Sequence, residues 1–207
     1  MSPIPELVAD RPVPGHPRPY DFPDTARSEL ANGLQVIVVP MPGRELVSAS
    51  IALRSGAADE PAAQAGATVL AARGLTEGTE LRDAIELTEA AERLGASLHA
   101  ESGWDATSAG VDVPASRLGA ALELLAEVVR RPAFPESEVD RLRDERLTDI
   151  IQAKADPRRR ADEAYIGTIY AASSPYHRTS GGTSDTVAGL TASELRAIHT
   201  RAAVPNR

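Results

Sequence analysis

The order of strand-like and helix-like segments restricts the fold of this chain more than any other feature of its sequence. Strand-like runs at 34–39 and 46–56 are followed by two helical segments, and then by two further strand-like runs within 96–114. The remainder, to about residue 201, has the pattern of three or four more helices. Strands and helices that are grouped in blocks in this way are typical of α+β proteins. We therefore expect an antiparallel sheet with helices packed on one face.

Turn residues indicate how the strands are connected. Asn32-Gly33 predicts a turn before the first strand, and the strands at 34–39 and 46–56 are expected to pair as a hairpin or meander. A second turn, at Ser102-Gly103, separates the third and fourth strands. Both turns support antiparallel pairing.

Two of the expected helices carry clear patterns. The segment 116–132 is amphipathic. Its expected buried stripe consists of Leu118, Leu122, Leu125 and Val129. The last helix begins with a capping box, in which Thr191 is the N-cap and Glu194 follows three residues later. Leu190 and Leu195 are placed for a hydrophobic staple across this helix start.

Charge and composition exclude several classes of function. The chain has no cysteine, which excludes a disulfide scaffold, a Cys-ligated zinc site and a thiol nucleophile. Its net charge of -8 argues against binding to nucleic acid or to anionic membranes, because both favour basic surfaces. No apolar stretch approaches the length of a membrane span.

The first 27 residues differ in composition from the rest. They are rich in proline and lack a charged start followed by an apolar run, so we expect an extended arm over 1–27 rather than a signal peptide. The protein is accordingly expected to be cytoplasmic, with residues 28–207 forming a single domain. Lys154 is the only lysine among many arginines, which suggests a GC-rich bacterial genome.

A series of segments within 29–206 resembles a known family in its order and spacing. The segments are "LANGLQVIVVP", "SGAADEPAAQAG" leading into "GLTEGT", "LGASLHAESGWDATSAGVDVP", "LLAEVVRRPAFPESEVDRLRDERLTDIIQAKADP", "SPYHRTSGGTSDTVAGLT" and "VPN". Together they resemble the pitrilysin/insulinase class of zinc peptidases, which includes the mitochondrial processing peptidase and its bacterial relatives. The resemblance implies an α+β domain that is usually one of two in a subunit. Residues 28–207 would be an N-terminal-type domain that stops before its last strand.

In active members of this family, the helix after "DEP" carries an inverted zinc motif, H-x-x-E-H. Its histidines lie four residues apart on one helix face, and its glutamate polarises the zinc-bound water. An ungapped comparison places Val69 and Arg73 at the histidine positions and Ala72 at the glutamate. Asp149 falls at the position of the third, acidic ligand. Valine has no lone pair, arginine is a permanent cation and alanine cannot act as a base, so the resemblance implies no zinc in this chain and zinc only in an active partner.

No other residues replace this site. The four histidines, His16, His99, His177 and His199, are far apart in the sequence, and each is expected to be structural or at the surface. The chain has no G-x-S-x-G nucleophile elbow, and "SGGTSD" at 180–185 lacks the Gly-Lys-Ser/Thr ending of a phosphate loop. By itself the chain is therefore not expected to be an enzyme.

Three functions remain open. In the first, which the resemblance favours, the chain is a non-catalytic subunit that forms a heterodimer with an active, zinc-bearing homologue and helps to enclose peptide substrates. In the second, it is a binding or assembly protein without a peptidase partner. In the third, it is a hydrolase with an unrecognised site. A neighbouring gene that encodes H-x-x-E-H would favour the first function, and a zinc measurement would test the third.

The strand at about 97–102 is expected to lie at an edge of the sheet. In active relatives the matching strand pairs with peptide substrates through main-chain hydrogen bonds, which requires an unpaired edge. Alternate side chains of this strand would face opposite sides of the sheet. The residues concerned are Leu98, His99, Ala100, Glu101 and Ser102. An internal strand is the alternative.

Arg73 raises a further expectation. A cation on a helix that packs against the core is costly unless it is paired or reaches water. Asp149 is expected on the facing helix, and we predict that its carboxylate bonds the Arg73 guanidinium directly or through one water. Asp144 and Glu145 are competing partners, and an Arg73 that extends into solvent is the alternative.

Overall fold

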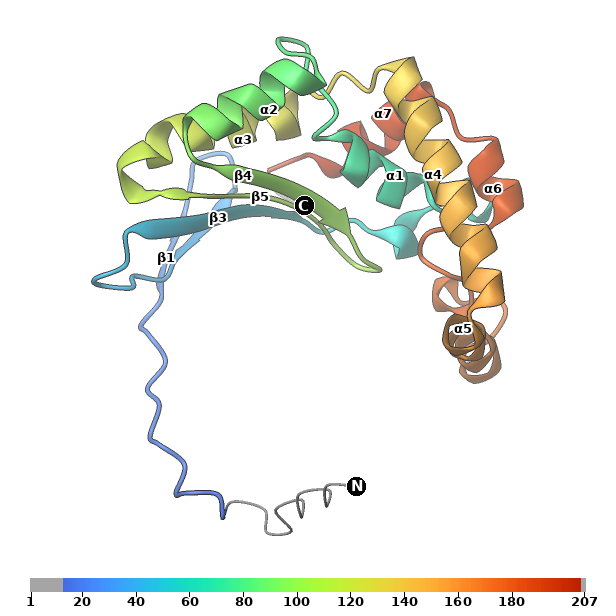
Figure 1. Ribbon diagram of the computed structural model, residues 1–207, viewed down its shortest axis with the longest axis horizontal. Helices are drawn as coiled ribbons and strands as arrows, with labels where there is room; N and C mark the ends of the chain where they lie inside the picture. The colour runs from blue at the N-terminus through green and yellow to red at the C-terminus, as the bar shows by residue number, and fades with distance from the viewer. Residues whose placement is uncertain (1–12, 206–207) are drawn as a thin grey trace, which may run out of the picture.

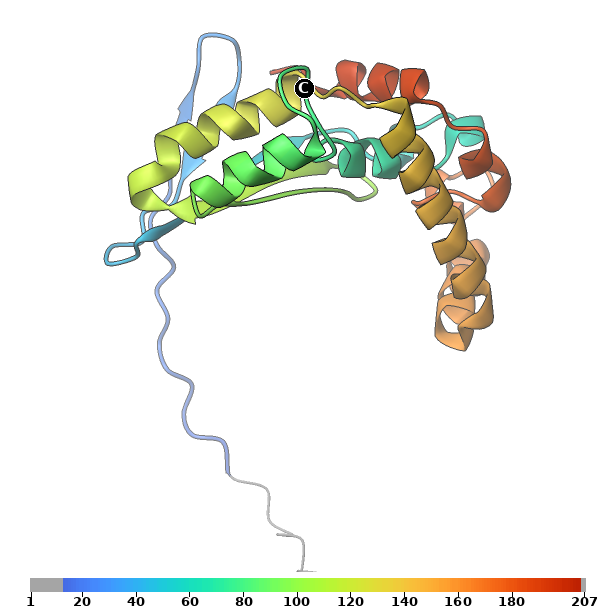
Figure 2. The same ribbon diagram turned by 45° about the horizontal axis from the view of Figure 1, so that its top comes forward.

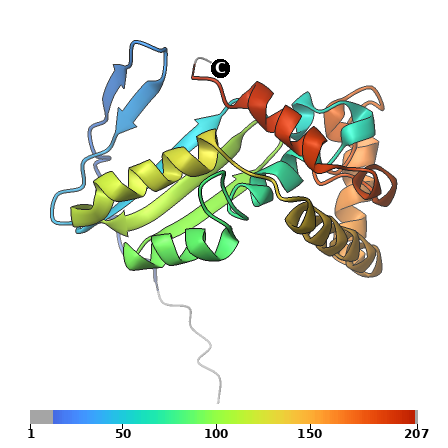
Figure 3. The same cartoon turned by 90° about the horizontal axis from the view of Figure 1, so that it is seen from above.

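The main sheet is three-stranded and antiparallel in a computed structural model, which describes residues 13–205. Its strands, in spatial order, are β3 (Leu46–Leu53), β5 (Thr107–Pro114) and β4 (Ser97–Ser102). Helices α2 (Ala84–Arg93) and α3 (Leu118–Arg130) cover one face of this sheet, as Figure 1 and Figure 3 show. The predicted α+β class, with an antiparallel sheet and helices on one face, is confirmed.

Alternation of side chains gives the sheet two different faces. Val111 and Val113 of β5 are buried in the hydrophobic core, and Ala49 and Ile51 of β3 pack against the same core. The opposite face carries exposed polar side chains, among them Ser48, Ser50, His99 and Asp112. Because that face is polar, it needs no covering layer to be stable in water.

The remaining helices lie beside the sheet. They are α1 (Ala67–Gly74), α4 (Glu136–Ala155), α5 (Pro157–Ile169), α6 (Ser184–Ala188) and α7 (Ala192–Ala202). The short helix α1 contacts β4, β5, α4 and α7, so it joins the two halves of the molecule. Figure 2 shows α4 running away from the sheet, with α5 packed at its far end. No helix within 13–205 is long and apolar enough to cross a membrane.

The expected pairing of the first two strand-like runs is wrong. β2 (Gln35–Val38) pairs with β1 (Ala26–Glu29), a strand that we did not predict, and β3 pairs with β5. The turn expected at Asn32-Gly33 joins β1 to β2. Two prolines and a glycine with positive φ interrupt the chain between β2 and β3, which separates the hairpin from the main sheet.

Helix α3 buries a stripe that is displaced from the predicted one. Leu122 is 43% exposed, and Leu118 is only partly buried, whereas Leu125 and Val129 are buried as expected. The buried stripe consists of Ala121, Leu124, Leu125, Val128 and Val129. These residues follow the i, i+3, i+4, i+7, i+8 spacing of a helix face, in which the small Ala121 replaces the larger leucine that we expected.

The capping box and hydrophobic staple that we predicted at the start of the last helix are confirmed. The Thr191 hydroxyl accepts a hydrogen bond from the Glu194 amide, and the Glu194 carboxylate accepts one from the Thr191 amide. Leu190 and Leu195 are both buried at this helix start, as the staple requires. The turn between β4 and β5 also lies where Ser102-Gly103 predicted it.

Candidate functional site

Helix α1 is the element on which the family resemblance places the inverted zinc motif. It begins after Gly66, whose φ of 98° is in the left-handed region. The Glu60 carboxylate accepts hydrogen bonds from the amides of Gly66, at 2.9 Å, and Thr68. These bonds satisfy two of the unpaired donors at the start of the helix. Most of α1 is buried, so its outward positions are held rigidly.

Three positions of α1 are those that the ungapped sequence comparison matches to the inverted zinc motif. Val69 and Arg73 are partly exposed and lie four residues apart, on the side of α1 that is not sunk into the core. Ala72 is 1% exposed and belongs to the buried side. Gly74 packs so closely on Phe134 that an added Cβ would lie 2.9 Å from the ring. The helix thus retains a tight fit to the core around the ligand positions.

Arg73 forms its ion pair with Glu145 and not with Asp149. The guanidinium lies 2.7 Å from the Glu145 carboxylate, and no hydrogen bond or ion pair joins it to Asp149. The predicted direct bond to Asp149 is therefore wrong, and one of the two named competitors is the partner. Glu145 and Asp149 lie one turn apart on α4. The longer side chain of Glu145 reaches Arg73, while Asp149 lines the same surface depression.

A second arginine in this depression, Arg141, forms ion pairs with three glutamates. Arg141 of α4 bonds Glu145 at 2.6 Å, Glu77 at 2.6 Å and Glu138 at 2.8 Å. The hydrogen bonds to Glu138 and Glu77 raise the pKa of Arg141 above its usual range. The bond from Arg141 lowers the pKa of Glu145, with Arg73 adding to the effect. The Glu145 carboxylate is therefore held by two cations, Arg73 and Arg141.

The depression shows no arrangement that suits a metal ion. Its lining residues are Arg73, Arg141, Asp144, Glu145, Thr148 and Asp149. No histidine is among them, and within residues 13–205 no group of three or more His, Asp or Glu side chains is arranged to hold a metal. Two guanidinium groups stand where a dication would be attracted, and arginine cannot act as a ligand. The side chains that line this depression do not form a set of zinc ligands.

Strand β4 lies at an edge of the sheet. It pairs with β5, and within the described chain its other side has no strand partner. Leu98 and Ala100 pack against the core, whereas His99 and Glu101 are exposed on the other face. The edge position and the division of side chains agree with the expectation from the sequence. Ser102 ends the strand, and its hydroxyl accepts a bond from Thr107 at 3.0 Å.

The His99 side chain lies across the polar face of the sheet. It covers Gly110, where an added Cβ would come within 2.4 Å of the imidazole Nε2. Its Nδ1 lies 3.9 Å from the carboxylate of Asp112, which also accepts a hydrogen bond from the Ser48 hydroxyl. Gly110 therefore provides the space that this ring occupies. The other histidines lie elsewhere: His16 before β1, His177 in a short 3-10 helix and His199 in α7.

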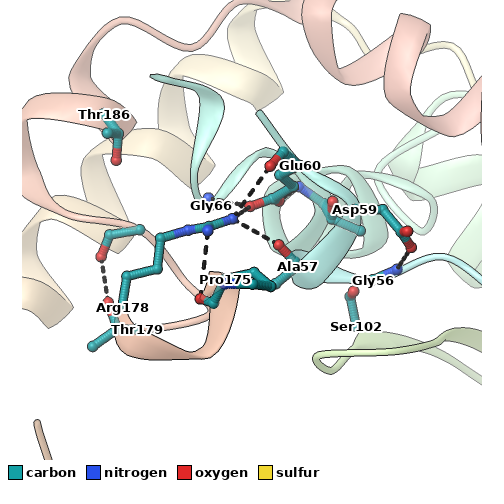
Figure 4. A network of polar contacts seen from close by, with 12 residues as sticks. Gly56, Ala57, Asp59, Glu60, Gly66, Ser102, Pro175, Arg178, Thr179 and Thr186 are labelled. Atoms are coloured by element: carbon teal, nitrogen blue, oxygen red, sulfur yellow. Dashed lines mark hydrogen bonds and ion pairs between the residues drawn. The ribbon is translucent and has the colours of Figure 1, made fainter. Parts of the chain in front are cut away.

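A buried ion pair beside α1 was missed by sequence reasoning. The Glu60 carboxylate is 1% exposed, and the Arg178 guanidinium lies 3.7 Å from it, as Figure 4 shows. Arg178 also donates to the carbonyl of Ala57 at 2.8 Å and to the carbonyl of Pro175 at 3.4 Å. These contacts connect the loop around 170–178 to the segment that precedes α1. The segments "DEP" and "PYHR" carry these residues, but no local pattern in the sequence indicates that they meet.

A known protein family matches most of this chain. The family model described as "Insulinase (Peptidase family M16)" matches residues 35–178, most of the described chain. The chain belongs to the insulinase family. This membership confirms the resemblance to the pitrilysin/insulinase class that the sequence segments indicated.

Two similar proteins are uncharacterized zinc proteases of mycobacteria. The protein from Mycobacterium leprae is 27% identical over 181 residues, which cover 87% of this chain and 40% of the relative. The protein from Mycobacterium tuberculosis strain H37Rv is 26% identical over 181 residues, which cover 87% of this chain and 41% of the relative. The present chain spans less than half the length of these relatives.

Solved insulinase-family structures share the fold. A peptidase M16 inactive domain from Pseudomonas fluorescens superposes with a TM-score of 0.80 at 24% identity, over 85% of this chain and 43% of that one. Pitrilysin superposes with a TM-score of 0.75 at 21% identity, over 90% of this chain and 20% of that one. The arrangement of sheet and helices is therefore that of a family domain.

Proposed function

We propose that this insulinase-family domain binds extended peptides without cleaving them, as the zinc-free member of a pair with an active, zinc-bearing homologue. The observation that carries the proposal is the combination of an unpaired β4 edge with an adjacent α1 whose ligand positions hold Val69, Ala72 and Arg73. The edge offers main-chain donors and acceptors to a peptide. The helix offers no metal, no activated water and no general base.

Loss of catalysis is tested with the purified chain. We expect less than a stoichiometric amount of zinc after dialysis and no cleavage of fluorogenic peptides, because Val69, Ala72 and Arg73 offer neither a metal ligand nor a general base. Metal analysis by mass spectrometry and a peptide assay with and without chelator give the answer. One equivalent of zinc together with chelator-sensitive turnover would overturn this part of the proposal.

Peptide binding at the β4 edge has a distinctive signature. In an added strand, alternate amides point toward the edge, so methylating those amides removes its hydrogen bonds. We expect a labelled peptide to lose binding when amides of one parity are N-methylated and to keep it when the other parity is methylated. Fluorescence anisotropy measures both series. Equal effects of the two series would contradict strand addition.

Pairing is tested by co-expression with the homologue of the same genome that carries H-x-x-E-H. We expect the two chains to co-purify as a heterodimer and the complex to cleave peptides faster than the homologue alone. If the chains remain separate while the peptide signature persists, the domain is a binding protein without a peptidase partner.

A further inference from the structure

Three aromatic side chains gather just beyond the end of β4. The ring centroids of Trp104 and Tyr176 are 5.2 Å apart, and those of Tyr170 and Tyr176 are 5.6 Å apart. Trp104 is the only tryptophan of the chain, and the chain contains few other aromatic residues. None of the three rings is buried, and Tyr170 is 41% exposed. An aromatic cluster that remains accessible to solvent offers ring surface to a ligand.

The backbone under Trp104 is held in place by the segment that follows β3. The amide of Ala57 donates to the carbonyl of Gly103 at 3.0 Å, and the amide of Ala58 donates to the carbonyl of Trp104 at 2.9 Å. This approach is so close that a Cβ on Gly56 would lie 2.4 Å from the Trp104 carbonyl oxygen. The backbone that carries Trp104 is therefore fixed before any ligand arrives, which reduces the entropy lost on binding.

The loop that carries Tyr176 is attached to the same segment. Arg178, two residues later, donates to the Ala57 carbonyl and pairs with the buried Glu60 carboxylate. The turn that carries Trp104 and the loop that carries Tyr176 are thus both bonded to the segment that follows β3. Because two parts of the chain that are far apart in sequence are fixed to a common segment, the distance between their rings is set by the fold.

Two carboxylates, Asp105 and Asp59, lie close enough to influence the Tyr176 ring. The Tyr176 hydroxyl donates to the Asp105 carboxylate, and this bond, with a smaller contribution from Asp59, raises the pKa of Tyr176. Glu101 is exposed near the end of β4. The nearby cation, Arg178, is already paired with Glu60. Ring faces and carboxylates together attract a positively charged group, and ring faces bind a guanidinium or ammonium directly.

From this placement we infer that Trp104, Tyr170 and Tyr176 form a subsite for a basic side chain of a peptide that pairs with β4. The inference rests on the proposed peptide-binding function. Trp104 lies two residues beyond the end of the strand. Since a strand advances about 3.3 Å per residue, the basic side chain belongs roughly one to three residues beyond the position that pairs with Ser102.

Trp104 also supplies the measurement. We would compare two extended peptides that lack Trp and Tyr and differ only in carrying arginine or citrulline, its uncharged analogue, at the same position. The arginine peptide is expected to bind about five- to tenfold more tightly, the range for a partly desolvated cation on aromatic rings. It is also expected to change the emission of Trp104, and the preference is expected to weaken with added salt.

Variants of the aromatic residues test whether the preference for the arginine peptide arises at the cluster. Trp104→Leu and Tyr170→Leu are each expected to remove the difference between the two peptides, and circular dichroism checks that both variants fold. Tyr165→Leu is the matched control, because Tyr165 is 64% exposed on α5 and makes no ring contact with the cluster. The control should keep the full preference.

Each outcome decides a separate question. Equal affinity for the arginine and citrulline peptides would overturn the subsite but leave peptide binding intact. No affinity for either peptide would overturn both the subsite and the proposed function. A preference that survives in Trp104→Leu and Tyr170→Leu would place recognition of the basic side chain elsewhere.

Discussion

Glu60 and Arg178 form a buried ion pair that joins the start of α1 to a loop 118 residues away. Glu60 uses its carboxylate twice more, for the amides of Gly66 and Thr68. A carboxylate removed from water in this way is tolerated because each of its oxygens accepts a hydrogen bond.

Removing this carboxylate should destabilise the domain strongly. Glu60→Ala is expected to lower the free energy of unfolding by about 3–5 kcal/mol, because Arg178 and two helix amides lose their partner. Urea denaturation measures the change. Glu80→Ala, at an exposed position, is the control and should alter stability by no more than about 0.5 kcal/mol. Similar losses in the two variants would contradict a special role for Glu60.

The Arg73–Glu145 pair should contribute little to stability. The two side chains are 37% and 44% exposed, and exposed ion pairs contribute about 0–1 kcal/mol. A double-mutant cycle with Arg73→Ala and Glu145→Ala is expected to show a coupling within that range. The cycle of Arg73→Ala with Asp149→Ala is the comparison, and its coupling should be smaller. A larger coupling to Asp149 would indicate that the prediction from the sequence was right in solution.

Restoring ligands should restore metal binding. Val69→His, Arg73→His and Asp149→Glu together supply three donors on the contacting helices α1 and α4, and replacing Arg73 removes a repelling cation from the depression. We expect about one equivalent of zinc after dialysis. Ala72 stays unchanged because it is 1% exposed and the glutamate at that position of the motif is not a ligand. The same variant with Arg73→Ala in place of Arg73→His lacks one donor and should retain clearly less zinc.

Stability should fall in mild acid because of His199. Burial lowers the pKa of this imidazole, while a bond to the Val129 carbonyl at 2.7 Å opposes the shift. The unfolded chain, with a pKa of about 6.5, therefore takes up a proton first, and the free energy of unfolding decreases as pH falls through that value toward the folded pKa. Each pKa unit of depression corresponds to about 1.4 kcal/mol.

Two variants assign this pH dependence. His199→Gln retains a donor for the Val129 carbonyl but does not titrate, so the slope on the acid side of about pH 6.5 should flatten. His16→Gln, at an exposed position before β1, is the matched control substitution. Urea denaturation at several pH values provides the measurement. An unaltered slope in His199→Gln would assign the effect to another group.

Two glycines should respond to alanine with opposite signs. Gly182 has a φ of 73°, and an added Cβ would lie 2.2 Å from the Ala65 carbonyl oxygen, so Gly182→Ala should cost about 1–3 kcal/mol. Gly119 lies exposed in α3 with nothing within 4 Å of an added Cβ. Gly119→Ala should raise the free energy of unfolding by about 0.5–1 kcal/mol. Thermal melts of both variants test the pair.

Local signals account for what the sequence predicted well. The capping box at Thr191 and the turn after Ser102 depend on residues within a few positions of each other, and both occur as expected. The β4 edge was predicted from family resemblance, since no local pattern distinguishes an edge strand from an internal one. The separate β1–β2 hairpin was missed because the choice of strand partner depends on which faces the whole sheet buries.

Details of the site depend on distances that sequence does not contain. Glu145 and Asp149 lie on the same side of α4, and only the reach of the longer side chain decides which one bonds Arg73. The Glu60–Arg178 pair joins segments from distant parts of the chain, so no spacing rule could indicate it. The aromatic cluster beyond β4 is likewise assembled from a turn and a loop that meet only in the folded molecule.

Strand β3, at the edge of the sheet opposite β4, affects how this protein behaves in concentrated solution. Within the described chain β3 pairs on one side only, and its sequence, "LVSASIAL", contains no charge and no proline. Edge strands that lack such protective residues are templates for intermolecular assembly. Concentrated preparations should therefore self-associate through β3 unless an extended segment occupies that edge, and a single lysine at an outward position such as Ser50 would be the simplest remedy.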